Sequence, residues 1–134
     1  MIKVVVVDDH DIVRGAVSSL LDANDEIDVI GEAANGKAAI GMVEELKPDV
    51  VVMDISMPGM DGITATEKIV AANGRHTRVV MLSMFASSVL VEQALKKGAT
   101  GYLLKRSTPA ELVKGIIAAS QGKRFLSAGI ASQI

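Results

Sequence analysis

The chain has 134 residues, of which 49% are hydrophobic and 22% charged, with a formal net charge of −2 and no cysteine. A chain of this length can bury enough surface to fold as one domain without a disulfide, and the lack of cysteine excludes cysteine-ligated zinc and thiol nucleophiles. Aromatic residues are too few to stack single-stranded nucleic acid, and the apolar runs are too short to span a membrane and follow no leader, so we expect a cytoplasmic protein.

Five short apolar runs predict the strands of the fold. The runs are Val4–Val7, Val29–Ile30, Val50–Met53, Val79–Leu82 and Gly101–Leu104. The first, third and fourth are rich in β-branched or other apolar residues and end abruptly at a polar residue. This pattern is typical of strands that are buried on both faces of a parallel sheet.

Apolar residues at helical spacing follow each predicted strand. These helical segments are Ile12–Leu21, Ala39–Leu46 before Pro48, Ile63–Val70, Leu90–Leu95 before Gly98, and Leu112–Ile117. The last has the clearest beginning, because Thr108–Glu111 forms a capping box with proline at the first helical position. Gly41 and Gly115 interrupt two of these segments at a cost of about 1 kcal/mol each, and we expect both to allow close packing.

The alternation of strands and helices predicts the fold class. Five β-α units indicate an α/β protein with a doubly wound, five-stranded parallel sheet of flavodoxin-like order 2-1-3-4-5. After Gly122 the pattern dissolves. We therefore expect residues 1–122 to form the domain, and residues 123–134 to be a C-terminal tail or the start of a linker.

Polar residues stand where four of the five predicted strands end. Asp8 and Asp9 follow the first strand, Asp54 the third, Ser83 the fourth and Lys105 the fifth. Each alone has an ordinary explanation, such as a helix cap, a loop hydroxyl or a solvated lysine. Because ligands of this fold bind beyond the carboxyl ends of the strands, the five together predict one site.

The predicted site combines three carboxylates with a lysine and a hydroxyl. Crowded carboxylates repel one another and need a compensating cation, and oxygen ligands favour Mg²⁺. A cation and an ammonium group around one carboxylate suit phosphoryl transfer onto it. The charges are unevenly distributed: residues 1–61 carry 13 acidic and 4 basic groups, whereas residues 62–134 carry 3 acidic and 10 basic groups. This indicates either a cation site that faces an anion-binding surface or two solvated faces of opposite charge.

Four segments carry a resemblance to a known family. They are Val7–His10, Asp54–Gly62, Leu82–Ser83 and Gly98–Lys105. Over about residues 2–122 the chain resembles the receiver domain of two-component response regulators. The resemblance implies that Asp54 accepts a phosphoryl group from a sensor histidine kinase, and that the protein is a switch rather than a multi-turnover enzyme.

The same resemblance implies roles for the other site residues. Asp9, Asp54 and the backbone carbonyl of Ser56 would bind Mg²⁺ directly, with Asp8 acting through water.

On the other side of the implied site, Ser83 and Lys105 would bind the phosphoryl oxygens. Tyr102 would swing inward on phosphorylation and reshape the surface around the fourth helix, the fifth strand and the fifth helix.

Finer features are similar to the NarL/FixJ (LuxR-type) subfamily. They are His10 after the aspartates, Pro58–Gly59, the segment Gly101–Lys105 without a following proline, and Gly122–Ser127. This likeness implies a homodimer and DNA binding through a C-terminal helix-turn-helix that the 134 residues do not contain. Arg106 replaces the proline that many receivers have after the lysine, which leaves open whether that peptide bond is cis.

Two alternatives remain beside this interpretation. One is a stand-alone receiver that acts by protein-protein contact. The other, less favoured, is a small aspartyl-phosphate phosphohydrolase, which normally has Asp-x-Asp after the first strand and a cap domain. The two histidines, His10 and His76, lack a second ligand at metal spacing, so we expect them to be solvated or locally hydrogen-bonded.

Overall fold

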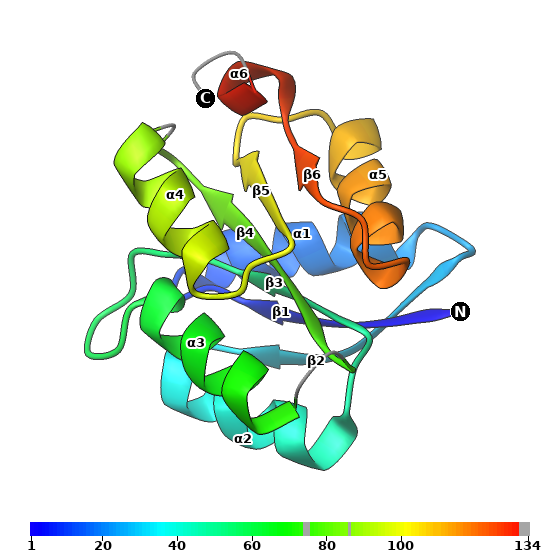
Figure 1. Ribbon diagram of the computed structural model, residues 1–134. Coiled ribbons are helices and arrows are strands. Elements are labelled where there is room, and N and C mark those ends of the chain that lie inside the picture. Colours follow the sequence, from blue (N-terminus) through cyan, green and yellow to red (C-terminus); the bar gives the residue numbers. More distant parts are fainter. Residues whose placement is uncertain (74–75, 86, 132–134) are drawn as a thin grey trace.

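The computed structural model, which describes residues 1–73, 76–85 and 87–131, consists of a parallel sheet between two layers of helices (Figure 1). The strands are β1 (Ile2–Val7), β2 (Ile27–Ala33), β3 (Val50–Met53), β4 (Arg78–Ser83), β5 (Gly101–Leu104) and β6 (Phe125–Leu126). Their order in the sheet is β2-β1-β3-β4-β5-β6, and every pair is parallel. The predicted fold class and the order 2-1-3-4-5 are confirmed, with a short sixth strand added.

Five main helices follow the first five strands, as predicted. The helices are α1 (Asp11–Asp22), α2 (Gly36–Leu46), α3 (Gly62–Asn73), α4 (Ser88–Lys96), α5 (Pro109–Ser120) and the short α6 (Ala128–Ala131). The capping box of α5 is present: the Thr108 hydroxyl accepts a hydrogen bond from the Glu111 backbone N–H, and the Glu111 carboxylate accepts one from Thr108. Among the helices of the described residues, none is long and apolar enough to cross a membrane.

Two apolar cores lie on the two faces of the sheet. Val5 and Val7 of β1 belong to the core under α2, α3 and α4, whereas Val4 and Val6 belong to the core under α1 and α5. All four side chains are at most 2% exposed. Burial of one such side chain stabilises the fold by about 1.5–3 kcal/mol, and burial of both faces explains why the strand is an unbroken valine run.

The segment after Gly122 is more ordered than its sequence pattern indicated. Phe125–Leu126 pairs with Gly101–Tyr102 of β5, and Ile130 of α6 is fully buried in the core under α4. A two-residue strand and a four-residue helix are too short to produce a recognisable period, which is why the sequence predicted only a tail.

The two helical glycines differ in their surroundings. A Cβ at Gly115 would lie 2.8 Å from Leu103 Cδ1 and 3.2 Å from Phe125 Cδ1, so close packing is confirmed there. A Cβ at Gly41 would have no atom within 4 Å outside its own stretch of helix, so the same prediction is wrong for that residue.

Candidate functional site

Adjacent strands bring the three carboxylates to one end of the sheet. Val7, the last residue of β1, is paired with Met53, the last residue of β3, so Asp8 and Asp54 begin their loops side by side. The Asp54 backbone N–H donates to the Val7 carbonyl at 3.0 Å. Register alone therefore places these two side chains together.

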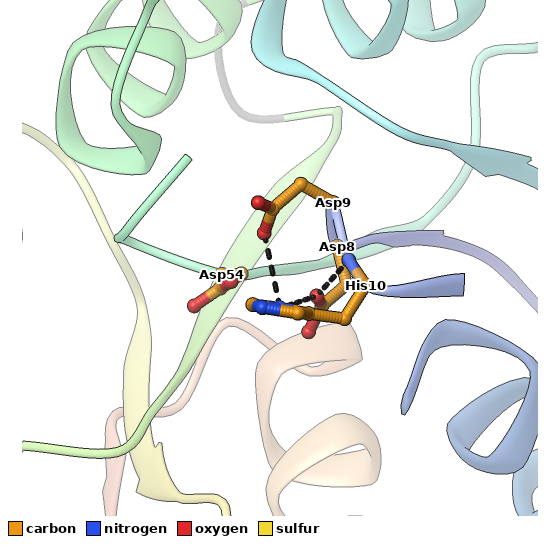
Figure 2. Close-up of side chains that lie close together, drawn as sticks. All are labelled: Asp8, Asp9, His10 and Asp54. Atoms are coloured by element: carbon orange, nitrogen blue, oxygen red, sulfur yellow. Dashed lines mark hydrogen bonds and ion pairs between the residues drawn. The ribbon is translucent and has the colours of Figure 1, made fainter. Parts of the chain in front are cut away.

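The acidic cluster, Asp8, Asp9 and Asp54, is assembled as predicted (Figure 2). One ligand atom from each of these residues and from His10 lies within 4.8 Å of the others. Lys105 approaches from the end of β5, with Nζ 2.9 Å from Asp8 Oδ2 and 3.4 Å from Asp54 Oδ2. Since its side chain is only 13% exposed, this lysine is a nearly buried counterion for two carboxylates.

The two buried carboxyl groups have opposite pKa shifts. Burial and the neighbouring charge of Asp8 raise the pKa of Asp54, and the attraction of Lys105 does not offset them. Burial also acts to raise the pKa of Asp8, but hydrogen bonds from Lys105 and from the His10 backbone outweigh it, so that the pKa lies below its ordinary value. At Lys105 burial acts to lower the pKa, but the hydrogen bond to Asp8 and the charge of Asp54 raise it.

Two buried oxygens of the acidic cluster make no well-formed hydrogen bond among the described residues. Asp9 Oδ1 and Asp54 Oδ2 are buried and make only the ion-pair contacts with His10 and Lys105. A buried carboxylate oxygen without a donor is costly. These acceptor-only groups in a small space fit a hard divalent cation that favours oxygen ligands.

Arg14 is a site residue that the sequence reasoning missed. Its Nη1 donates to the Asp8 carbonyl at 2.8 Å, while Nη2 contacts Asp11 at 2.8 Å and Nε contacts Glu32 at 3.2 Å. The arginine of α1 therefore ties the loop after β1 to the end of β2. An arginine one turn into a helix that follows two aspartates is the only signal in the sequence.

Gly62 fixes the other side of the acidic cluster. It begins α3, where its N–H donates to the Ile55 carbonyl at 2.8 Å, and a Cβ at this position would collide with the backbone carbonyl of Asp54. Asp61 caps the helix by accepting a hydrogen bond from Thr64 at 2.9 Å. The loop between β3 and α3 thus returns directly over Asp54, and only glycine permits this close approach.

The hydroxyl region, consisting of Ser83, Phe85 and Tyr102, lies beside the acidic cluster at the ends of β4 and β5. Ser83 Oγ accepts a hydrogen bond from the Phe85 N–H at 3.1 Å, and Tyr102 Oη donates to the Phe85 carbonyl at 2.8 Å. Tyr102 is fully buried, and burial raises the pKa of its phenol, opposed by a hydrogen bond with Ser83. The side chain of Tyr102 is therefore already in the inward, buried position in this structure.

The remaining predicted site residues also have defined places. Ser56, two residues after Asp54, lines a groove of about 620 Å³ between the β3–α3 loop and α4. The Lys105–Arg106 peptide bond is trans. His10 contacts Asp8 and His76 contacts the Lys47 carbonyl, and His10 in addition lies among the carboxylates of the acidic cluster, which its place in the sequence did not indicate.

Comparison with known proteins places the chain in a family. Residues 4–117 match the response regulator receiver domain. The transcriptional regulatory protein LnrK of Bacillus subtilis (strain 168) is 40% identical over 134 residues, which are 100% of this chain and 60% of LnrK. The chain spans 60–63% of the length of curated relatives that it matches.

Solved structures agree with these sequence matches. A LuxR-family two-component response regulator from Aurantimonas sp. SI85-9A1 has a TM-score of 0.96 at 38% identity, covering 100% of this chain and 95% of that one. The structure of two RcsB dimers bound to two parallel DNAs has a TM-score of 0.86 at 28% identity, covering 98% of this chain and 66% of that one.

Proposed function

The chain belongs to the response regulator receiver domain family, and we propose that it is a phosphorylation-controlled switch whose phosphoacceptor is Asp54. A receiver is a signalling module rather than a conventional enzyme. The observation that carries the choice of Asp54 is that its buried Oδ2, which has no hydrogen bond, lies 3.4 Å from Lys105 Nζ, whereas the similarly buried Asp9 Oδ1 contacts His10. Asp8 is instead neutralised by its 2.9 Å contact with the same lysine.

The proposed phosphodonor is a phosphohistidine on a sensor histidine kinase. A carboxylate oxygen of Asp54 forms the new O–P bond as the N–P bond of the donor breaks, and the departing imidazole takes up a proton from water. Lys105 holds a fixed positive charge beside the acceptor and would bind a phosphoryl oxygen. Such positioned charge is the main contribution that a protein makes to phosphoryl transfer.

The proposed cofactor is Mg²⁺, held by Asp9, Asp54 and the backbone carbonyl of Ser56, with Asp8 acting through water. When bound, the ion supplies positive charge against the phosphoryl oxygens. The orphaned oxygens of Asp9 and Asp54 support this ligand set, because each is an unused acceptor inside the acidic cluster.

The proposed response begins at the hydroxyl region. Ser83 would exchange its hydrogen bond from Phe85 for one to the phosphoryl group, which frees the loop that Tyr102 also contacts through the Phe85 carbonyl. Large apolar side chains on and beside this loop are exposed: Met84 is 67% and Phe85 56% exposed. Movement of the loop would therefore change an apolar surface next to α4, β5 and α5.

The proposed output lies beyond the described residues. LnrK is named a transcriptional regulatory protein, and the RcsB structure contains dimers on DNA. By analogy we propose that this receiver acts in the cytoplasm, forms a homodimer and controls transcription through a C-terminal DNA-binding helix-turn-helix outside the 134 residues, to which residues 123–134 lead.

The experiment that tests the proposal is intact-mass measurement after incubation with Mg²⁺ and acetyl phosphate. We expect a gain of one phosphoryl group in the wild type, and no gain in Asp54→Asn or in the presence of a chelator. An unchanged wild-type mass, or an equal gain in Asp54→Asn, contradicts the proposal. Steady release of phosphate over many turnovers would indicate a phosphohydrolase instead.

A further inference from the structure

We propose that His10 is a ligand of the cation site, so that this site binds a first-row transition ion such as Co²⁺ or Zn²⁺ through an imidazole nitrogen as well as through carboxylates. The inference rests on the cation site of the proposed function and adds a nitrogen donor to its oxygen ligands. The consequence is a preference for transition ions over Mg²⁺ that is stronger than three carboxylates alone would give.

The first support is the spacing of the donor atoms. His10 Nδ1 lies 3.2 Å from Asp8 Oδ1 and 3.2 Å from Asp9 Oδ1. Two ligands that are each about 2.1 Å from one ion are about 3.0 Å apart at a right angle and about 3.4 Å apart at a tetrahedral angle. The imidazole nitrogen already stands at ligand spacing from two carboxylates before any ion is present.

The second support is the way in which the His10 backbone is held. Its N–H donates to Asp8 Oδ1 at 2.8 Å, and its carbonyl accepts the Arg14 N–H at 2.9 Å, the first turn of α1. With both backbone groups fixed, the ring extends from the N-cap position of α1 toward the acidic cluster (Figure 2). The side chain remains 65% exposed, so coordination through Nδ1 leaves the opposite edge of the ring in water.

The third support is the buried oxygen of Asp54 that makes no hydrogen bond. Asp54 is 5% exposed, its Oδ2 has no hydrogen bond, and one of its oxygens lies within 4.8 Å of the other three donor atoms. Asp9 Oδ1 is likewise buried without a hydrogen bond. A cation placed among the four residues would lie beside buried carboxylates that have unused acceptor capacity.

The mixed donor set determines which ions are preferred. Carboxylate and carbonyl oxygens suit Mg²⁺, whereas imidazole suits Zn²⁺, Cu²⁺, Ni²⁺ and Co²⁺. The same site would therefore bind Mg²⁺ through its oxygens, and would bind a transition ion more tightly because the imidazole joins.

A hydrogen bond is the competing explanation of the two 3.2 Å contacts. A single Nδ1–H points at one acceptor, however, so a hydrogen bond to Asp8 Oδ1 does not account for the equally short contact with Asp9 Oδ1. The two explanations differ once an ion is added, because a hydrogen-bonding ring is displaced from the cluster and a ligating ring is bound to the metal.

The test is to titrate the chain with Co²⁺ and follow the histidine ring signals by NMR. The chain contains two histidines, and His76 serves as the internal reference because its ring contacts the Lys47 carbonyl, outside the donor group. We expect the His10 ring protons to show the large paramagnetic shifts of a Co²⁺-bound imidazole, while those of His76 stay in the diamagnetic range.

Matched variants make the result quantitative. We expect His10→Asn to weaken Co²⁺ binding, measured by calorimetry, about tenfold or more, and to change Mg²⁺ binding less than about threefold. His76→Asn should change neither. Unshifted His10 signals, or equal losses of Co²⁺ and Mg²⁺ affinity in His10→Asn, would overturn the inference.

The same samples separate this inference from the proposed function. If Mg²⁺-dependent phosphorylation is retained but the His10 signals do not shift, only the imidazole ligand is wrong. If the Co²⁺ shifts appear but no phosphoryl group is gained with Mg²⁺, the metal site stands and the switch is wrong.

Discussion

The acidic cluster and the hydroxyl region lie at the same end of the sheet but are built in opposite ways. In the acidic cluster, like charges are forced together and two buried oxygens lack hydrogen bonds. In the hydroxyl region, Ser83 and Tyr102 are satisfied by the two backbone groups of Phe85. The first region is therefore prepared to take a positively charged ligand, and the second must break existing contacts before it can respond.

Because of this difference, we expect the acidic cluster to bind the incoming groups and the hydroxyl region to respond to them. The energy that holds the carboxylates together comes from their neighbours, chiefly Lys105, the Arg14 contact with the Asp8 carbonyl and the close return of the chain at Gly62. The hydroxyl region needs no such support. Substitutions should accordingly affect one region without affecting the other, and the predictions below test this separation.

The largest effect is expected from Gly62→Ala, which places a methyl group against the Asp54 carbonyl. We expect a loss of about 3 kcal/mol in the free energy of unfolding, measured with urea, because backbone on both sides must shift. The control is Gly41→Ala, where the added methyl group would have no atom of another element within 4 Å and a gain of about 0.5–1 kcal/mol is expected. Equal effects at the two glycines would disprove the proposed close contact.

Lys105→Met should have the next largest effect. Removal of the nearly buried ammonium leaves Asp8 and Asp54 without their shared counterion, and we expect the free energy of unfolding to fall by about 2 kcal/mol at neutral pH without metal. Added Mg²⁺ should restore part of that loss. Lys114→Met, on the exposed side of α5, is the control and should change stability by less than about 0.5 kcal/mol. If Lys105→Met were as mild as the control, the lysine would not be the counterion of the cluster.

Tyr102→Phe should affect the hydroxyl region alone. Loss of the 2.8 Å hydrogen bond to the Phe85 carbonyl is expected to cost about 1 kcal/mol. Mg²⁺ affinity, measured by calorimetry, should stay the same, because Tyr102 does not contact the acidic cluster in the described structure. A parallel loss of Mg²⁺ affinity would show that the two regions are coupled before phosphorylation.

The smallest effect is expected in the dependence of stability on pH in the presence of a chelator. Asp54 has a raised pKa in the folded state, so its contribution is present below the unfolded pKa and is lost as pH rises through the folded value. Asp8 has a lowered pKa, so its contribution is present above the unfolded pKa and is lost as pH falls through the folded value.

The two asparagine variants should therefore change the slope of the free energy of unfolding against pH in opposite directions. Measured from about pH 3 to about pH 7, Asp54→Asn should remove a loss of stability that accompanies rising pH, and Asp8→Asn should remove a gain. Slopes that change in the same direction would contradict the unequal sharing of Lys105 between the two carboxylates.

Most of the fold and the acidic cluster could be predicted because their signals are repetitive. Valine runs that end in aspartate mark buried strands, and a parallel sheet places all their carboxyl ends together. The capping box at Thr108 similarly marks the beginning of α5. In each case the residue type and its local neighbours determine the structure.

Features that depend on distant contacts could not be predicted in this way. The buried position of Ile130 and the pairing of Phe125 with Gly101 depend on β5, more than twenty residues earlier in the sequence. The contact of Arg14 with the end of β2 depends on Glu32, which lies in another element. The space next to Gly41 depends on which elements pack against α2. None of these contacts leaves a pattern in the segment itself.

The most direct test of the account is to locate the phosphoryl group among the three clustered carboxylates. After incubation with Mg²⁺ and acetyl phosphate, hydroxylamine converts an acyl phosphate into a hydroxamate whose position tandem mass spectrometry can determine. We predict modification at Asp54 alone, because its buried oxygen is the one left without a hydrogen bond beside Lys105. Modification at Asp8 or Asp9, or no modification at all, would contradict the account.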